Sequence, residues 1–513
     1  MLNKKILRIE SPEEKIDIIK EENTNDNIQL KKIFDESNCQ EENYYSKSCN
    51  QFLLKKELME SKYLEKHPEE NNYLYPSLDD PNFIVKIAEK KEFNDTKYDG
   101  IIHDDIKAYA DSISKQEFEL APHQAFVRNF LSSQTPYNSL LLYHQLGSGK
   151  TCSAIGVCEE MRDYSKQVGI TKRIIIVASK NVQDNFRLQL FDERKLKNTD
   201  GIWNIKGCVG NKLLKEINPS GFVGLSREKI ISQIKSLINN SYLFLGYGQF
   251  ANYIIKTASI DSGSYKNDND KRRAVIRKLK SEFDGRLIVI DEVHNIRMTE
   301  DNENKHVAMN LELLVKSADN LRLLLLSATP MYNSYKEIVW LINLMNINDR
   351  RGKVIESNIF DKNGNIKEEG REILIRKATG YISFVRGENP YSFPYRVYPN
   401  QFAVGHTFKD IPYPTLQMNG KQINSDDKLK FLDLYLLKIG QVQKIGYEYI
   451  INNLKTKVTN ITTKKGTTRI MPAFEELENF GYTLLQIPLE ALIIVYPYEG
   501  LNENNSIKKK IRN

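Results

Sequence analysis

The feature that most constrains the fold is a block of short apolar runs that alternate with helical patterns, from about residue 118 to residue 346. The runs are rich in Val, Ile and Leu on both faces, as is typical of strands buried between helices. The predicted strands cover residues 139–144, 173–179, 241–247, 286–293 and 321–329. The helical patterns cover residues 150–164, 182–190, 227–239 and 334–346. Such alternation predicts an α/β fold with a doubly wound, mostly parallel sheet and right-handed crossovers.

The flanks of this block have a different texture. Residues 1–95 form a polar N-terminal extension, and its first 70 or so residues carry too little apolar surface to offset chain entropy. We therefore expect the extension to be partly disordered, residues 96–346 to form the α/β domain, and residues 347–513 to form a mainly helical region. Within that last region we predict a long helix at 425–454, with Ser425 as its N-cap, and a polar loop at 460–469.

Composition excludes several classes of protein. No run approaches eighteen apolar residues, and the N-terminus has no apolar core of a signal peptide, so neither a membrane span nor secretion is expected. The five cysteines form no C-x-x-C pair, so we expect neither zinc nor disulfides, and a reducing, cytoplasmic compartment fits best. The net charge of +7 tolerates a polyanionic partner without demanding one.

The loop after the first predicted strand has the composition of a phosphate cradle. Gly147, Ser148, Gly149, Lys150 and Thr151 stand between an apolar strand and a helix, which is the P-loop arrangement. Glycines let backbone N–H groups converge on phosphate oxygens, and the helix N-terminus adds positive potential. The lysine would reach the β- and γ-phosphates of ATP, and the threonine hydroxyl would bind Mg²⁺.

This cradle departs from the strict P-loop pattern at one position. The pattern begins with glycine, and His144 stands there instead. Read alone, the stretch could be a turn that happens to contain glycines and a lysine. A second element of the same site would decide between these alternatives.

That second element follows the predicted strand at 286–293. Asp291 and Glu292 come at its carboxyl end, and such ends share one edge of a parallel sheet with the P-loop. Asp291 can enter the Mg²⁺ shell, and Glu292 can orient and deprotonate the attacking water. A solvated acid pair is the alternative, but two such motifs in this order favour a site for ATP hydrolysis. A third pair, Ser327 and Thr329, stands at the carboxyl end of the run at 321–329 and can relay hydrogen bonds, although a plain turn is the alternative there.

The order of GSGKT, DEVH and SAT resembles motifs I, II and III of superfamily 2 helicases and translocases, over residues 120–345. The resemblance implies a RecA-like P-loop NTPase domain. It implies that His294, with Ser327 and Thr329, couples hydrolysis to nucleic-acid binding. LAPHQAFVRNFL resembles the upstream Q-type element, in which Gln124 would read adenine. Segments similar to those that grip a nucleic-acid backbone imply that role for Lys180, Asn181 and Tyr247.

Further segments at 75–83, 380–399 and 480–497 resemble signatures of the ATPases of large DNA viruses, a group that includes the poxvirus early transcription factor small subunit and nucleoside triphosphatase I. Membership implies a DNA-dependent ATPase of viral transcription, located in the cytoplasm, in a viral factory or in the virion. The partner would be DNA or RNA, and ATP and Mg²⁺ would be required.

A complete helicase of this superfamily has a second RecA-like lobe, whose Q-x-x-G-R-x-x-R motif supplies arginine fingers. Gly370 and Arg371 form the nearest match, but the next arginine, Arg376, stands too far along. An arginine finger contributes about 10³ to 10⁵ in rate in related phosphoryl-transfer systems. We therefore expect a partner chain to carry the second lobe, and the isolated chain to bind ATP but hydrolyse it slowly. The rival reading is a non-hydrolysing scaffold subunit of a viral transcription complex.

Overall fold

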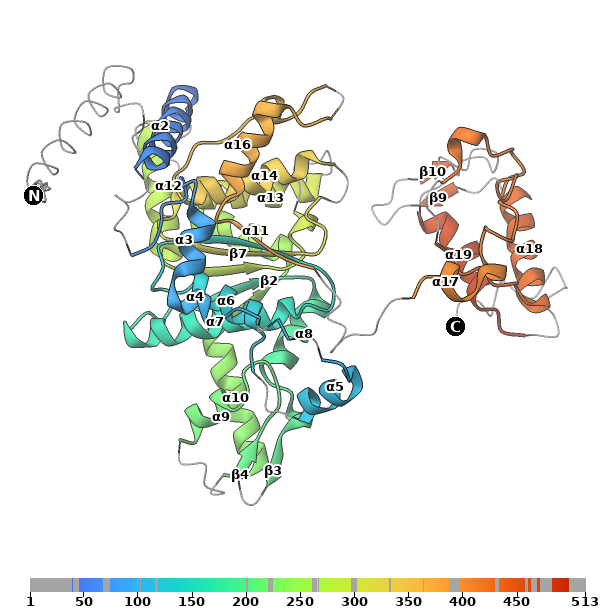
Figure 1. Ribbon diagram of the computed structural model, residues 1–513, viewed down its shortest axis with the longest axis horizontal. Coiled ribbons are helices and arrows are strands. Elements are labelled where there is room, and N and C mark those ends of the chain that lie inside the picture. Colours follow the sequence, from blue (N-terminus) through green and yellow to red (C-terminus); the bar gives the residue numbers. More distant parts are fainter. Residues whose placement is uncertain are drawn as a thin grey trace, which may run out of the picture. The chain divides into compact units, whose positions relative to one another are not determined.

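The computed structural model describes residues 39, 46–67, 74–98, 100–101, 103–115, 119–199, 202–219, 225–260, 265, 267–296, 302–331, 334–362, 364–386, 397–429, 433–456, 460–462, 468–470 and 482–497. The chain divides into two compact units, Met1–Pro394 and Tyr395–Asn513, which we describe separately (Figure 1).

The first unit is built on a six-stranded sheet in the order β5-β2-β6-β7-β1-β8, and all neighbouring strands are parallel. The strands are β1 (Ser139–His144), β2 (Ile174–Val177), β5 (Tyr242–Leu245), β6 (Leu287–Ile290), β7 (Arg322–Ser327) and β8 (Ile382–Val385). Five of them are the five predicted strands. The prediction of an α/β fold with a parallel sheet is confirmed.

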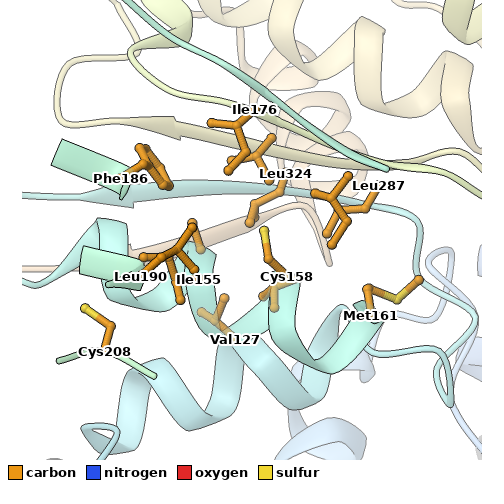
Figure 2. Packing of buried hydrophobic residues seen from close by; sticks show 14 of the residues in the cluster. Val127, Ile155, Cys158, Met161, Ile176, Phe186, Leu190, Cys208, Leu287 and Leu324 are labelled. Carbon is orange, nitrogen blue, oxygen red and sulfur yellow. The ribbon is translucent and has the colours of Figure 1, made fainter. Parts of the chain in front are cut away.

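Helices cover both faces of this sheet, and a hydrophobic core lies on each face. Successive residues of a strand point alternately into one core and the other. Leu140 and Leu142 face one core, to which α6 (Pro122–Phe130), α7 (Lys150–Gln167), α8 (Lys180–Leu190) and α10 (Arg227–Ser241) contribute (Figure 2). Leu141 faces the other core, which contains side chains of α11 (Tyr247–Ala258), α12 (Asp268–Phe283), α13 (Asn302–Ser317) and α14 (Lys336–Asn348). Burial on both faces explains why these strands are apolar without alternation.

The remaining elements of the first unit surround this body. They are α2 (Lys47–Lys66), α3 (Phe83–Glu89), α4 (Lys91–Asn94), α5 (Ile106–Lys115), η2 (Glu193–Lys195), β3 (Lys197–Thr199), β4 (Ile202–Asn204), α9 (Lys212–Ile217), η4 (Val293–Asn295), α15 (Glu356–Ile359) and α16 (Glu368–Ala378). The antiparallel pair β3–β4 and α9 form an excursion between α8 and α10. The predicted domain boundary at residue 346 falls inside this unit, because β8 lies beyond it and pairs with β1.

Part of the segment expected to be poorly ordered is a helix, and for α2 that expectation is wrong. The Glu57 side chain accepts hydrogen bonds from the Lys377 ammonium and from the N–H of Gly352, the latter at 2.6 Å. Asn50 exchanges two hydrogen bonds with the backbone of Lys353. These partners lie some 300 positions further along the chain than the α2 residues that they contact, so no local sequence pattern could predict the contacts.

The second unit contains α17 (Pro399–Phe402), η5 (Val404–His406), η6 (Ser425–Asp427), α18 (Gln441–Thr456), β9 (Asn460–Thr462), β10 (Thr468–Ile470) and α19 (Tyr482–Ile493). Two predictions are wrong here. The long helix expected at 425–454 begins only at Gln441, directly after Gly440, a residue that favours helix ends over helix interiors. The segment expected to be a polar loop contains the antiparallel pair β9–β10.

The expectation of no disulfides is also wrong, since Cys39 is joined to Cys49 and Cys152 to Cys208. Cys158 is a free, buried thiol. The second bridge fastens the β3–α9 excursion to the first turn of α7. Its two cysteines are 56 positions apart, a separation that carries no motif. Among the described residues, no helix is long and apolar enough to cross a membrane.

Candidate nucleotide-binding site

The site lies at the carboxyl edge of the sheet, where three adjacent strands end. In the strand order β6, β7 and β1 are neighbours. Tyr143 of β1 is in register with Ser327 of β7, and Ile290 of β6 is in register with Leu325. The strands therefore end at nearly the same level, and the loops that carry the GSGKT, DEVH and SAT motifs meet at one edge.

The P-loop has the backbone that a phosphate cradle needs. Gly147 and Gly149 have φ angles of 81° and 77°, in the left-handed region that favours glycine. Gly149 is the N-cap of α7, whose first residue is Lys150. The Lys150 ammonium donates a hydrogen bond of 2.8 Å to the His144 carbonyl. Burial lowers the pKa of Lys150, and the negative charges of Glu292 and Asp291 oppose that shift.

The acid pair is partly desolvated. Asp291 is 7% exposed. Burial, together with the charge of Glu292, raises the pKa of Asp291 to about 6. The Asp291 carboxylate accepts a hydrogen bond of 2.8 Å from the N–H of Glu292. Glu292 has a φ of 47°, which is rare for a residue with a side chain and is common at functional sites.

The proposed coupling residues are in contact with the acid pair and with each other. The Nδ1 atom of His294 lies 3.0 Å from the Ser327 hydroxyl and 3.3 Å from a carboxylate oxygen of Glu292. The N–H of Thr329 donates a hydrogen bond of 3.0 Å to the same Ser327 hydroxyl. A chain of polar contacts thus joins the loop after β6 to the loop after β7.

Gln124 lies against the P-loop. Its Oε1 atom accepts a hydrogen bond of 3.0 Å from the N–H of Ala121, and its Nε2 atom donates one of 3.3 Å to the carbonyl of Gly149. A Cβ atom on Gly149 would come within 2.4 Å of that nitrogen. The side chain is buried in this position. Its contact with adenine stays a prediction.

The residues predicted to contact nucleic acid fall into two groups. Lys180 and Asn181 are exposed at the start of α8, directly after β2. Tyr247 begins α11 after β5, and its hydroxyl donates a hydrogen bond of 2.8 Å to the Asp291 carbonyl. It also accepts one of 3.4 Å from Asn295. The structure thus links Tyr247 to the DEVH loop, and its contact with nucleic acid remains a prediction.

Three residues beside the site were not predicted from the sequence. His123 contacts the Ser148 carbonyl of the P-loop, and Tyr98 contacts His123. Ser383 of β8 lies 2.9 Å from Nε2 of His144, whose side chain is fully buried. That burial favours a structural role for His144. The only signal for His123 was its place beside Gln124 in the Q-type element.

These residues fit Mg²⁺ and a nucleoside triphosphate. Gly147 and Gly149 place no Cβ atom in the loop and adopt the left-handed backbone, and the N-terminus of α7, a helix of 18 residues, begins directly after them. The Asp291 carboxylate and the Thr151 hydroxyl are oxygen ligands of the kind Mg²⁺ prefers. Within the described part of the chain, no three His, Cys, Asp or Glu side chains cluster as a metal site.

Residues 117–332 match the family model of the type III restriction enzyme, res subunit. The matched segment runs from just before α6 to just after β7, and so it contains the P-loop and both of the other loops.

The chain is also similar to proteins of large DNA viruses. A protein of Acanthamoeba polyphaga mimivirus named "Putative ATP-dependent RNA helicase" is 26% identical over 66% of this chain and 29% of its own length. A second protein of that virus with the same description is 28% identical over 62% of this chain and 49% of its own length. The early transcription factor large subunit homolog of African swine fever virus is 23% identical, over 69% of this chain and 38% of its own length. The chain thus spans less than half the length of these relatives.

Proposed function

We propose that the chain is the ATP-binding and ATP-hydrolysing lobe of a nucleic-acid helicase or translocase. The observation that carries the proposal is the placement of Lys150, Asp291 and Glu292 at one edge of one sheet, within electrostatic reach of each other. The family match at residues 117–332 and the similarity to helicases of large DNA viruses support it.

The residues of the site divide the chemistry among them. Backbone N–H groups of Gly147, Ser148 and Gly149, with the Lys150 ammonium, bind the phosphates. Thr151 and Asp291 would hold Mg²⁺, which would neutralise phosphate charge during the transfer. The Glu292 carboxylate orients the attacking water and accepts its proton. Gln124 binds the adenine from its place against the cradle.

His294 occupies the position from which hydrolysis can be coupled to nucleic-acid binding. It touches the general base Glu292 on one side and Ser327 on the other. A displacement of the loop after β7 therefore changes the contacts of the general base. Lys180, Asn181 and Tyr247 bind the nucleic-acid backbone, so binding is salt-dependent and insensitive to sequence.

We further propose a role in viral transcription, in a setting like that of the poxvirus early transcription factor small subunit and nucleoside triphosphatase I. The similarity to the African swine fever virus early transcription factor homolog supports a place in a transcription complex. A second RecA-like lobe supplies the arginine finger to this site. Hydrolysis by this chain alone is slow for want of that finger.

A non-hydrolysing scaffold is the second candidate. The observation in its favour is that Gly370-Arg371, the nearest match to the arginine-finger motif, has its next arginine, Arg376, too far along. The Glu292→Gln variant separates the two functions because the change keeps shape and removes the base. In the assembled complex, an enzyme loses ATPase activity by orders of magnitude while it retains ATP binding. Unchanged activity of the complex would favour the scaffold.

A further inference from the structure

Two consecutive residues of α6 hold two consecutive carbonyls of the P-loop. His123 and Gln124 are the second and third residues of that helix. The Nε2 atom of His123 lies 2.8 Å from the Ser148 carbonyl oxygen, and the Nε2 atom of Gln124 lies 3.3 Å from the Gly149 carbonyl oxygen. The Q-type motif accounts for the glutamine but assigns nothing to the histidine.

The partners of His123 determine which ring nitrogen carries its proton. A carbonyl oxygen can only accept, so the Nε2–H group donates to Ser148. In a neutral imidazole the Nδ1 atom is then an acceptor, and the Tyr98 hydroxyl, 2.7 Å away, donates to it. Burial lowers the pKa of His123, which favours the neutral ring that this arrangement requires. Tyr98 therefore fixes the tautomer that can hold the P-loop.

Because the peptide unit is planar, the contact between His123 and the Ser148 carbonyl also determines where the next N–H group points. The chain has no cis peptide bond among its described residues, and in a trans peptide the C=O and the next N–H point in opposite directions. A Ser148 carbonyl drawn toward α6 therefore directs the Gly149 N–H away from α6. The Gln124 contact does the same for the N–H of Lys150. Both donors are groups that a P-loop presents to phosphates.

We propose that His123, oriented by Tyr98, is a positioning residue that holds the Ser148–Gly149 peptide with its N–H directed at the nucleotide phosphates. The inference rests on the proposed function, since it concerns the same cradle. His123 acts through the peptide and makes no contact with the nucleotide.

The experiment measures the dissociation constant of ADP with Mg²⁺ for the full chain and its variants. One neutral hydrogen bond contributes about 0.5–1.5 kcal/mol, which corresponds to roughly 2- to 12-fold in affinity. We expect that loss for His123→Ala and His123→Phe. His123→Gln retains an amide N–H that can reach the same carbonyl, and it should bind within about twofold of the wild type. Tyr98→Phe leaves the tautomer unfixed and should fall between them. His306→Ala, on the exposed face of α13, is the matched control and should bind as the wild type does.

The Phe and Gln variants keep the test decisive, since both fill the site even if the alanine variant fails to fold. Equal affinities for His123→Phe and His123→Gln would overturn the inference. If the wild type binds Mg·ADP, Lys150→Ala does not, and every His123 variant binds like the wild type, only the positioning role fails. If the folded wild type binds no nucleotide, the proposed function fails and the positioning role with it.

Discussion

A methyl group added at Gly149 tests the shape of the cradle most sharply. Gly149 has a φ of 77°, and a Cβ atom there would come within 2.4 Å of the Gln124 side chain. Left-handed backbone costs a non-glycine residue about 1–2 kcal/mol. Displacing Gln124 from the Gly149 carbonyl costs a further hydrogen bond, about 0.5–1.5 kcal/mol. Since the loop relaxes out of the phosphate-binding conformation to relieve this strain, Gly149→Ala should weaken binding of ATP analogues by roughly 10- to 300-fold.

The same helix offers a matched control for that substitution. Gly169, just beyond the C-terminus of α7, has a φ of 75°, and nothing lies within 4 Å of its would-be Cβ. Gly169→Ala therefore carries the backbone cost alone and lies away from the cradle. Calorimetric titration of both variants with a non-hydrolysable ATP analogue and Mg²⁺ separates the effects. The reasoning fails if Gly149→Ala binds within threefold of the wild type, or if Gly169→Ala weakens binding equally.

Two further predictions concern buried charge. Glu57→Gln leaves the fully buried Lys377 without its counter-charge, so it should lower the free energy of unfolding, measured in urea titrations, by about 3–5 kcal/mol. The double variant Glu57→Leu/Lys377→Met removes both charges, and its free energy of unfolding should lie nearer that of the wild type. Equal losses of stability in the two variants would contradict this account of how α2 is held. Burial, with the charges of His123 and Lys150, lowers the pKa of His144 from 6.5 to about 3. Between these values the unfolded chain binds a proton that the folded chain does not, so the unfolding free energy falls as the pH is lowered through that window, and His144→Phe should show a shallower slope, by up to one proton.

The sheet could be predicted because burial on both faces leaves a strong local mark. Each of the five predicted strands is a short apolar run, and the structure places all five in the sheet. The sixth strand, β8, carries no such mark. Its sequence, Ile-Ser-Phe-Val, is interrupted by a serine, and Phe384 within it is 58% exposed. Pairing with β1 is what makes it a strand, and pairing is not written in a local pattern.

Some residues of the candidate site could be predicted from the sequence, and others could not. Lys150, Asp291 and Ser327 stand beside strand ends in the sequence, and the parallel sheet brings those ends to one edge. His123 and Tyr98 reach the P-loop only through the packing of α6 and the segment before α5. Tyr98 precedes His123 by 25 positions, and His123 precedes Ser148 by another 25. No spacing rule joins three such residues, so the structure was needed to find them.

The central claim is that Lys150, Asp291 and Glu292 all act on one bound nucleoside triphosphate and its Mg²⁺ ion. The most direct measurement is calorimetric binding of a non-hydrolysable ATP analogue to the folded full chain, with and without Mg²⁺, in the wild type, Lys150→Ala and Asp291→Asn. The account predicts binding by the wild type that Lys150→Ala abolishes, and that loses its dependence on Mg²⁺ in Asp291→Asn. Binding that both substitutions leave unchanged would contradict it.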